Sequence, residues 1–99
     1  MAIKLAAVQA APVFLNKTAS TQKACELIRK AGFRGADVIG FPEGFIPGFP
    51  GCFPFLRRTD PLTESLYLQL FNNAVEVPGP EVELLQDACR EANIYAVVA

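Results

Sequence analysis

The chain has 99 residues, which is enough for at most one small domain. Hydrophobic residues make up 52% of the sequence, which predicts a well-buried core and argues against a disordered chain. The net charge is -1 and the basic residues form no stripe, so we expect no nucleic-acid partner. No apolar run is long enough to span a bilayer, so we expect no membrane partner either.

The cysteine and histidine content argues against a metal site. The chain has 3 cysteines, widely spaced and without a CxxC pair, and it has 0 histidines. We therefore expect no metal and no cofactor. Cys25 and Cys89 fall within predicted helices, where core packing is the expected role of a thiol. Free thiols are typical of a reducing compartment, so we predict a cytoplasmic protein.

The first third of the sequence predicts a strand followed by a helix. Residues 3–10 are a short apolar run, which is typical of a strand buried on both faces. Asn16 or Thr18 is placed to cap the helix, and Gly32 is expected to end it in a left-handed conformation. The apolar face of this helix recurs at helical spacing and consists of Ala24, Leu27, Ile28 and Ala31.

A second apolar run at residues 38–41 follows a turn at residues 35–37. Strand, helix and strand in this order predict a βαβ unit with two parallel strands in one sheet. Pro42 ends the second strand because proline has no N–H to donate to a neighbouring strand.

Residues 42–61 form a long segment rich in proline, glycine and phenylalanine. A disordered linker does not normally carry so many aromatic side chains. We therefore predict an ordered loop that forms an apolar wall around a pocket. The aromatic residues of this wall are Phe45, Phe49, Phe53 and Phe55.

The remaining sequence predicts two helices and a third strand. Leucines at every fourth position indicate a helix from Leu62 to about Asn72. Pro80 suits the first turn of a second helix and Asn93 its end. Residues 94–98 then predict a strand whose apolar side chains need to be buried on both faces. We expect residues 1–99 to be the N-terminal part of a single domain whose C-terminal part is missing.

Glu43 is the residue best placed for chemistry, because ligands of open α/β sheets bind at the carboxyl ends of the strands. Its apolar neighbours Phe41 and Phe45 lead us to expect a partly desolvated carboxylate, which suits a general base. A helix cap or a salt bridge is an equally open role for Glu43 on position alone. Cys52 lies nearby, but its Gly-Cys-Phe turn offers no activating partner, so lining a pocket is the expected role.

Two stretches of the sequence stand out as motifs. They are Ile-Lys-Leu-Ala-Ala-Val-Gln-Ala-Ala-Pro at residues 3–12 and Gly-Ala-Asp-Val-Ile-Gly-Phe-Pro-Glu-Gly-Phe-Ile-Pro-Gly-Phe-Pro at residues 35–50. Together they resemble the opening of a nitrilase of the carbon–nitrogen hydrolase superfamily. The similarity continues through Asn-Ala-Val-Glu-Val-Pro-Gly-Pro at residues 73–80 and into the final strand. The resemblance implies that this α/β chain is part of an α-β-β-α sandwich, truncated after the third strand. It also implies a homo-oligomer in the full-length protein.

The resemblance further implies a Glu-Lys-Cys triad in which Glu43 is the general base. The cysteine thiolate would attack a nitrile carbon to form a thioimidate, and water would release a carboxylic acid and ammonia. The lysine and cysteine are expected beyond Ala99, so this chain alone should be inactive. The substrate-pocket candidates are Phe49, Pro50, Cys52 and Phe53. Phe49 departs from the tyrosine that is common at its position.

Three functions stay open on the sequence. The chain is the first part of a nitrilase acting on a small-molecule nitrile, or of an amidase or carbamoylase of the same superfamily acting on an amide. The third alternative is a non-catalytic truncated product that binds a full-length relative through an exposed sheet edge.

Overall fold

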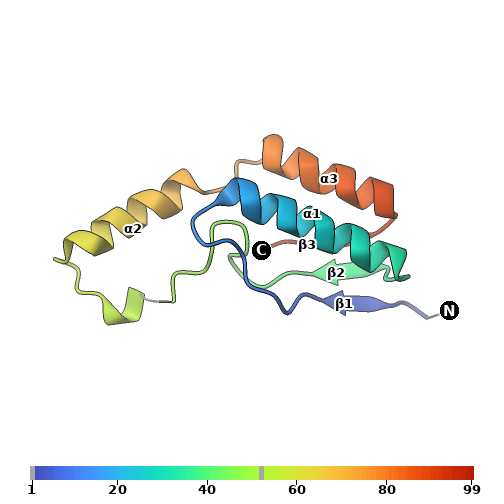
Figure 1. Ribbon diagram of the computed structural model, residues 1–99, viewed down its shortest axis with the longest axis horizontal. Coiled ribbons are helices and arrows are strands. Elements are labelled where there is room, and N and C mark those ends of the chain that lie inside the picture. Colours follow the sequence, from blue (N-terminus) through green and yellow to red (C-terminus); the bar gives the residue numbers. More distant parts are fainter. Residues whose placement is uncertain (1, 52) are drawn as a thin grey trace.

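The computed structural model describes residues 2–51 and 53–99 as an α/β arrangement of helices on a parallel sheet (Figure 1). The elements in chain order are β1 (Leu5–Ala7), α1 (Lys17–Phe33), β2 (Val38–Gly40), a 3₁₀ helix (Phe53–Phe55), α2 (Pro61–Asn72), α3 (Pro80–Ala92) and β3 (Tyr95–Val97). The predicted α/β class and the three predicted strands are confirmed, although each strand is shorter than the apolar run that predicted it.

The three strands form one parallel sheet in the order β1-β2-β3. Val38 of β2 is level with Leu5 of β1 and with Tyr95 of β3. Because β2 lies in the centre, the carboxyl ends of both neighbouring strands flank the segment that follows it. This places the residues after Gly40 at the edge of the sheet where ligands of such folds collect.

Helices α1 and α3 pack side by side and cover one face of the sheet (Figure 1). Side chains alternate between the two faces of a strand, so every second strand residue points at the helices. The core between the helices and the sheet contains Ala24, Ile28, Ile39, Phe41, Phe45, Ile46, Leu85, Ala88, Ala92 and Ile94.

The other face of the sheet carries apolar side chains without cover in the described part of the chain. Leu5 is 77% exposed, Tyr95 80% and Val97 61%. The prediction that the outer strands are buried on both faces is therefore wrong for this structure. The apolar runs were correctly located, but helices are present on only one of the two faces that their side chains reach.

This uncovered face makes the isolated chain a poor independent domain. We expect the 99-residue chain alone to bind a hydrophobic dye such as ANS and to lose its structure gradually on heating, because exposed apolar faces and strand edges favour association. Calorimetry with analytical ultracentrifugation measures this. A sharp, cooperative melt of a monomer would contradict it.

The ends of α1 differ in part from the prediction. Asn16 caps the helix, since its side-chain oxygen accepts a hydrogen bond from the Ala19 N–H at 3.0 Å. Gly32 does not end the helix, which runs on to Phe33, and the left-handed residue is Gly35 with φ +87°. Gly32 serves packing instead, because a Cβ there would lie 2.5 Å from the Ala92 Cβ of α3. Its missing side chain lets α1 and α3 touch.

The predicted boundaries of the later helices agree with the structure. Pro61 and Pro80 stand in the first turns of α2 and α3, as proline is suited to do. Asn93 ends α3 in the left-handed conformation with φ 51°, which confirms its predicted role. No helix within residues 2–51 and 53–99 has the length and apolar character needed to cross a membrane.

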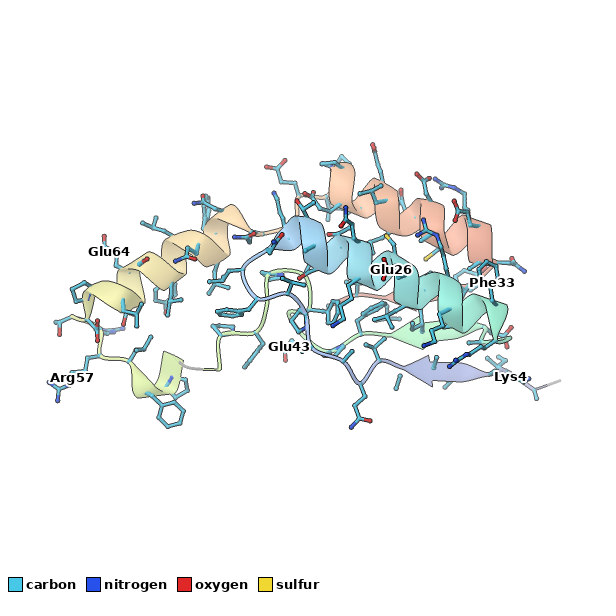
Figure 2. All side chains as sticks on the ribbon, in the orientation of Figure 1. Lys4, Glu26, Phe33, Glu43, Arg57 and Glu64 are labelled. Carbon is cyan, nitrogen blue, oxygen red and sulfur yellow. The ribbon has the colours of Figure 1, made fainter. Side chains whose placement is uncertain are left out.

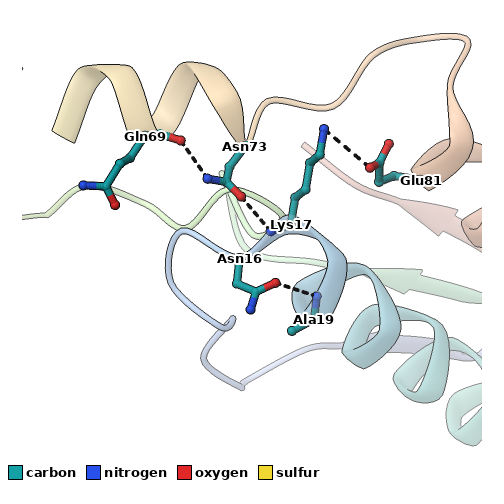
Figure 3. A network of polar contacts seen from close by, with 6 residues as sticks. All are labelled: Asn16, Lys17, Ala19, Gln69, Asn73 and Glu81. Atoms are coloured by element: carbon teal, nitrogen blue, oxygen red, sulfur yellow. Dashed lines mark hydrogen bonds and ion pairs between the residues drawn. The ribbon is translucent and has the colours of Figure 1, made fainter. Parts of the chain in front are cut away.

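Helix α2 projects away from the sheet and its two covering helices (Figure 1). A polar network joins its C-terminal end to the first turns of α1 and α3 (Figure 3). The Asn73 Oδ1 accepts a hydrogen bond from the Lys17 N–H at 2.9 Å, and the Asn73 Nδ2 donates to the Gln69 carbonyl at 2.8 Å. The Lys17 Nζ lies 3.6 Å from the Glu81 Oε1. The three helix ends therefore meet at one polar junction.

Candidate functional site

Glu43 lies at the carboxyl edge of the sheet, directly after β2 (Figure 2). Hydrogen bonds hold the backbone on both sides of it to the end of β3. The Phe41 N–H donates to the Val97 carbonyl at 3.0 Å, and the Gly44 N–H donates to the Ala99 carbonyl at 3.1 Å. The backbone that carries the carboxylate is thus hydrogen-bonded on both sides of Glu43 to the last residue of β3 and to Ala99, two residues after it.

The side chain of Glu43 is exposed to solvent. Its neighbours Phe41 and Phe45 are buried and turn into the core, where their ring centroids lie 5.1 Å apart. The prediction that the Glu43 carboxylate is partly desolvated is therefore wrong for this structure. The apolar neighbours pack under the helices on the covered side of the sheet, so they anchor the backbone of Glu43 without enclosing its carboxylate.

A tight turn follows Glu43 and is closed by glycines. Gly44 has φ +67° and Gly48 has φ +92°, a region that side chains disfavour. The Gly48 N–H donates to the Gly44 carbonyl at 2.9 Å. A Cβ at Gly48 would lie 2.5 Å from the Phe14 Cδ1, so the ring of Phe14 occupies the space beside this glycine.

The structure describes three of the four residues that the sequence offered as substrate-pocket candidates. Phe49 is 62% exposed and Pro50 is partly buried. Phe53 begins the 3₁₀ helix Phe53–Phe55, and Cys52 lies outside the described residues. Phe55 is 88% exposed, so neither it nor Phe49 forms the expected apolar wall here. The pocket role of the four candidates stays a prediction.

The structure contains a groove that the sequence did not reveal. It has a volume of about 850 Å³, begins beside Gly44, and runs between α3 and the free edge of β3. Its apolar lining includes Ile46, Val75, Leu85 and Val98. These residues come from four separate segments, and only the spatial position of α3 over β3 brings them together. Neither Phe49 nor Pro50 is part of this lining.

The described cysteines are placed for packing. Cys25 is buried, and its Sγ donates to the Leu84 carbonyl at 3.5 Å. Burial raises the pKa of the Cys25 thiol and also that of Cys89, so both resist forming the thiolate that a nucleophile needs. Within the described ranges, no three side chains of His, Cys, Asp or Glu come together as a metal-binding group.

The lysines do not supply a partner for Glu43 either. Lys17 faces Glu81 at the polar junction, and the Lys23 Nζ donates to the Ala11 carbonyl. Lys4 precedes β1, at the opposite edge of the sheet from Glu43 (Figure 2). Among the residues that the structure describes, only the glutamate of the expected catalytic set lies at the carboxyl edge.

Comparison with known proteins identifies the family. A profile of the family described as "Carbon-nitrogen hydrolase" matches residues 4–99. The chain belongs to the carbon–nitrogen hydrolase family. Several relatives of this carbon–nitrogen hydrolase carry nitrilase names. A nitrilase of Bacillus sp. (strain OxB-1) is 44% identical over 85 residues, which cover 86% of this chain and 24% of the relative.

Two further relatives of this carbon–nitrogen hydrolase chain likewise match most of this chain and a small part of their own length. An arylacetonitrilase of Hypocrea virens is 38% identical over 92 residues, or 93% of this chain and 27% of the relative. A bromoxynil-specific nitrilase of Klebsiella pneumoniae subsp. ozaenae is 37% identical over 91 residues, or 92% of this chain and 26% of the relative. The chain thus spans about a quarter of the length of each.

Proposed function

We propose that residues 1–99 form the first part of a nitrilase-type hydrolase domain, in which Glu43 is the general base. The observation that carries this proposal is the position of Glu43 after the central strand, with backbone hydrogen bonds from Phe41 and Gly44 to the end of β3. The similarity to nitrilases over nearly the whole chain supports the same reading. The catalytic lysine and cysteine would come from sequence that these 99 residues do not include.

In the proposed reaction, Glu43 takes the proton of the cysteine thiol, and the sulfur forms a bond to the nitrile carbon. Glu43 passes the thiol proton on to the nitrile nitrogen, which gives a thioimidate, and the lysine stabilises the negative charge that develops on this nitrogen. Glu43 then deprotonates a water that adds to the same carbon. Glu43 gives the water proton to the nitrogen, ammonia leaves with formation of a thioester, and a second water cleaves the acyl–sulfur bond to release the carboxylic acid and the thiol.

We further propose that a second sheet covers the exposed face of the present one, as in an α-β-β-α sandwich, and that the complete protein is a homo-oligomer. The support for the sandwich is the row of uncovered apolar side chains at Leu5, Tyr95 and Val97. A layer that buries them would complete the core on the side opposite α1 and α3.

A chimera tests the catalytic proposal. Residues 1–99 replace the matching segment of the Bacillus nitrilase, and we call the product the chimeric nitrilase. We expect it to convert phenylacetonitrile into the acid and ammonia, measured by ammonia release. A folded chimera that hydrolyses phenylacetamide but not the nitrile would favour the amidase or carbamoylase alternative. A folded chimera inactive on both would favour the non-catalytic alternative.

The buried thiol of Cys25 and the partly buried thiol of Cys89 lead to a further prediction about the chimeric nitrilase. At pH 8, iodoacetamide should label Cys25 and Cys89 more slowly than it labels the same residues after unfolding in urea, because burial raises both thiol pKa values. The native labelling rate should still rise when the pH increases above 9. Peptide mass spectrometry measures each site. Equal rates in native and unfolded protein would contradict the packing role.

A further inference from the structure

The turn that carries Glu43 has a second support besides its hydrogen bond to the residues after β3. Residues 13–16, which we call the supporting loop, form the last part of the connection from β1 to α1 and pass beside the turn. The Leu15 N–H donates to the Pro47 carbonyl at 3.0 Å. The ring of Phe14 lies against Gly48, where a Cβ would come within 2.5 Å of it. Both contacts fall on the last two residues of the turn.

The supporting loop is itself fixed to the buried side of α1. Ser20 is 0% exposed, and its Oγ accepts from the Val13 N–H at 3.0 Å and donates to the Val13 carbonyl at 2.9 Å. The Asn16 N–H donates to the same carbonyl at 3.1 Å. The loop is therefore anchored at both ends by hydrogen bonds to α1 and its cap.

Leu15 adopts an unfavourable backbone conformation within this loop. Its φ of 55° lies in the left-handed region, which a branched side chain rarely enters. Such a conformation persists only where the surrounding contacts fix it, and it concentrates at functional sites. In this conformation the Leu15 N–H donates to the Pro47 carbonyl, in the turn after Glu43.

We infer that Phe14 is a positioning residue for Glu43. The supporting loop and the end of the chain after β3 hold the turn at two separate points, Pro47–Gly48 and Gly44, so Glu43 keeps one orientation although its side chain is exposed. Loss of the Phe14 ring frees Gly48 and lets the turn shift, and misplacement of a catalytic group by about 1 Å lowers rates by about 100-fold. This inference rests on the proposed role of Glu43 as general base.

The test combines Phe14→Ala with Glu43→Gln in the chimeric nitrilase. We expect Phe14→Ala alone to lower kcat for phenylacetonitrile by about 10- to 100-fold with little change in KM. In the Glu43→Gln background the same substitution should lower kcat by less than about twofold, because no base remains to be positioned. Phe14→Tyr keeps the ring and should retain most of the activity.

Phe33→Ala is the matched control, because Phe33 is 77% exposed at the end of α1, far from the turn (Figure 2). It should leave kcat unchanged. An equal fall in kcat on Phe14→Ala in both backgrounds would overturn the positioning role and leave Glu43 as the base. An undiminished kcat in Glu43→Gln alone would instead overturn the proposed function, and the inference with it.

Ser20→Ala provides an independent variant if Phe14→Ala folds poorly. It removes both hydrogen bonds between the Ser20 hydroxyl and Val13 without touching the turn. We expect it to lower kcat in the Glu43 background and to have little effect with Glu43→Gln. The same fall in both backgrounds would count against the supporting loop as a positioning element.

Discussion

Glu43→Gln in the chimeric nitrilase is expected to lower kcat for phenylacetonitrile by about 10²- to 10⁴-fold. Glutamine keeps the shape of the side chain, but it cannot take a proton from a thiol or from water. The folded state should be preserved, because Glu43 is exposed and the backbone hydrogen bonds beside it do not involve its side chain. Steady-state kinetics measures the fall in kcat, and a thermal melt shows whether the folded state is preserved.

Glu26→Gln provides the matched control for this substitution. Glu26 is an exposed glutamate on α1, and it loses the same charge when replaced (Figure 2). The kcat of the Glu26→Gln variant should stay within about twofold of that of the unsubstituted chimeric nitrilase, since changes at exposed sites away from a functional group have small effects. A fall in kcat of similar size for both variants would indicate a general charge effect and would remove Glu43 from the catalytic role.

Gly32→Ala is expected to destabilise the packing of α1 on α3 by about 1–3 kcal/mol. Alanine is the better helix former by about 1 kcal/mol, but its Cβ would lie 2.5 Å from the Ala92 Cβ and 2.6 Å from the Ala92 carbonyl oxygen. Relief requires the two helix backbones to separate, which opens gaps around Ile28 and Ala88 in the core. The steric cost should therefore exceed the gain in helix propensity.

Amide hydrogen exchange of the chimeric nitrilase measures this effect locally. Protection of α1 and α3 should fall by about 5- to 150-fold, which corresponds to 1–3 kcal/mol for local opening. Gly51→Ala is the control, because among the described residues no atom beyond its chain neighbours lies within 4 Å of a Cβ at that glycine. Unchanged or increased protection in Gly32→Ala would show that the helix pair can separate without cost.

Short-range signals in the sequence were sufficient to locate the elements. Periodic apolar residues, the cap at Asn16 and the turn at Asn93 depend on neighbours a few positions away, and the structure agrees with them. The position of Glu43 at the sheet edge was also accessible, because it follows from strand order and direction alone. The parallel sheet places that residue as expected.

The mistaken predictions concern contacts between distant segments. Gly32 suits a helix end locally, and only the approach of Ala92 shows that its missing side chain serves packing. The exposure of Glu43 depends on which face the helices cover, which the apolar run around it does not specify. The supporting loop was missed because its contacts with Pro47 and Gly48 join residues more than thirty positions apart.

The hydrogen bond between Gly44 and Ala99 has a consequence for synthesis of the chain. The β1-α1-β2 unit has all its residues once translation passes Gly40, whereas the edge beside Glu43 cannot close until β3 has been made. At 5–20 residues per second, this delay is on the order of 3–12 s. During that interval the nascent chain exposes the unpaired edge of β2. We therefore expect chaperone binding to matter most in this period.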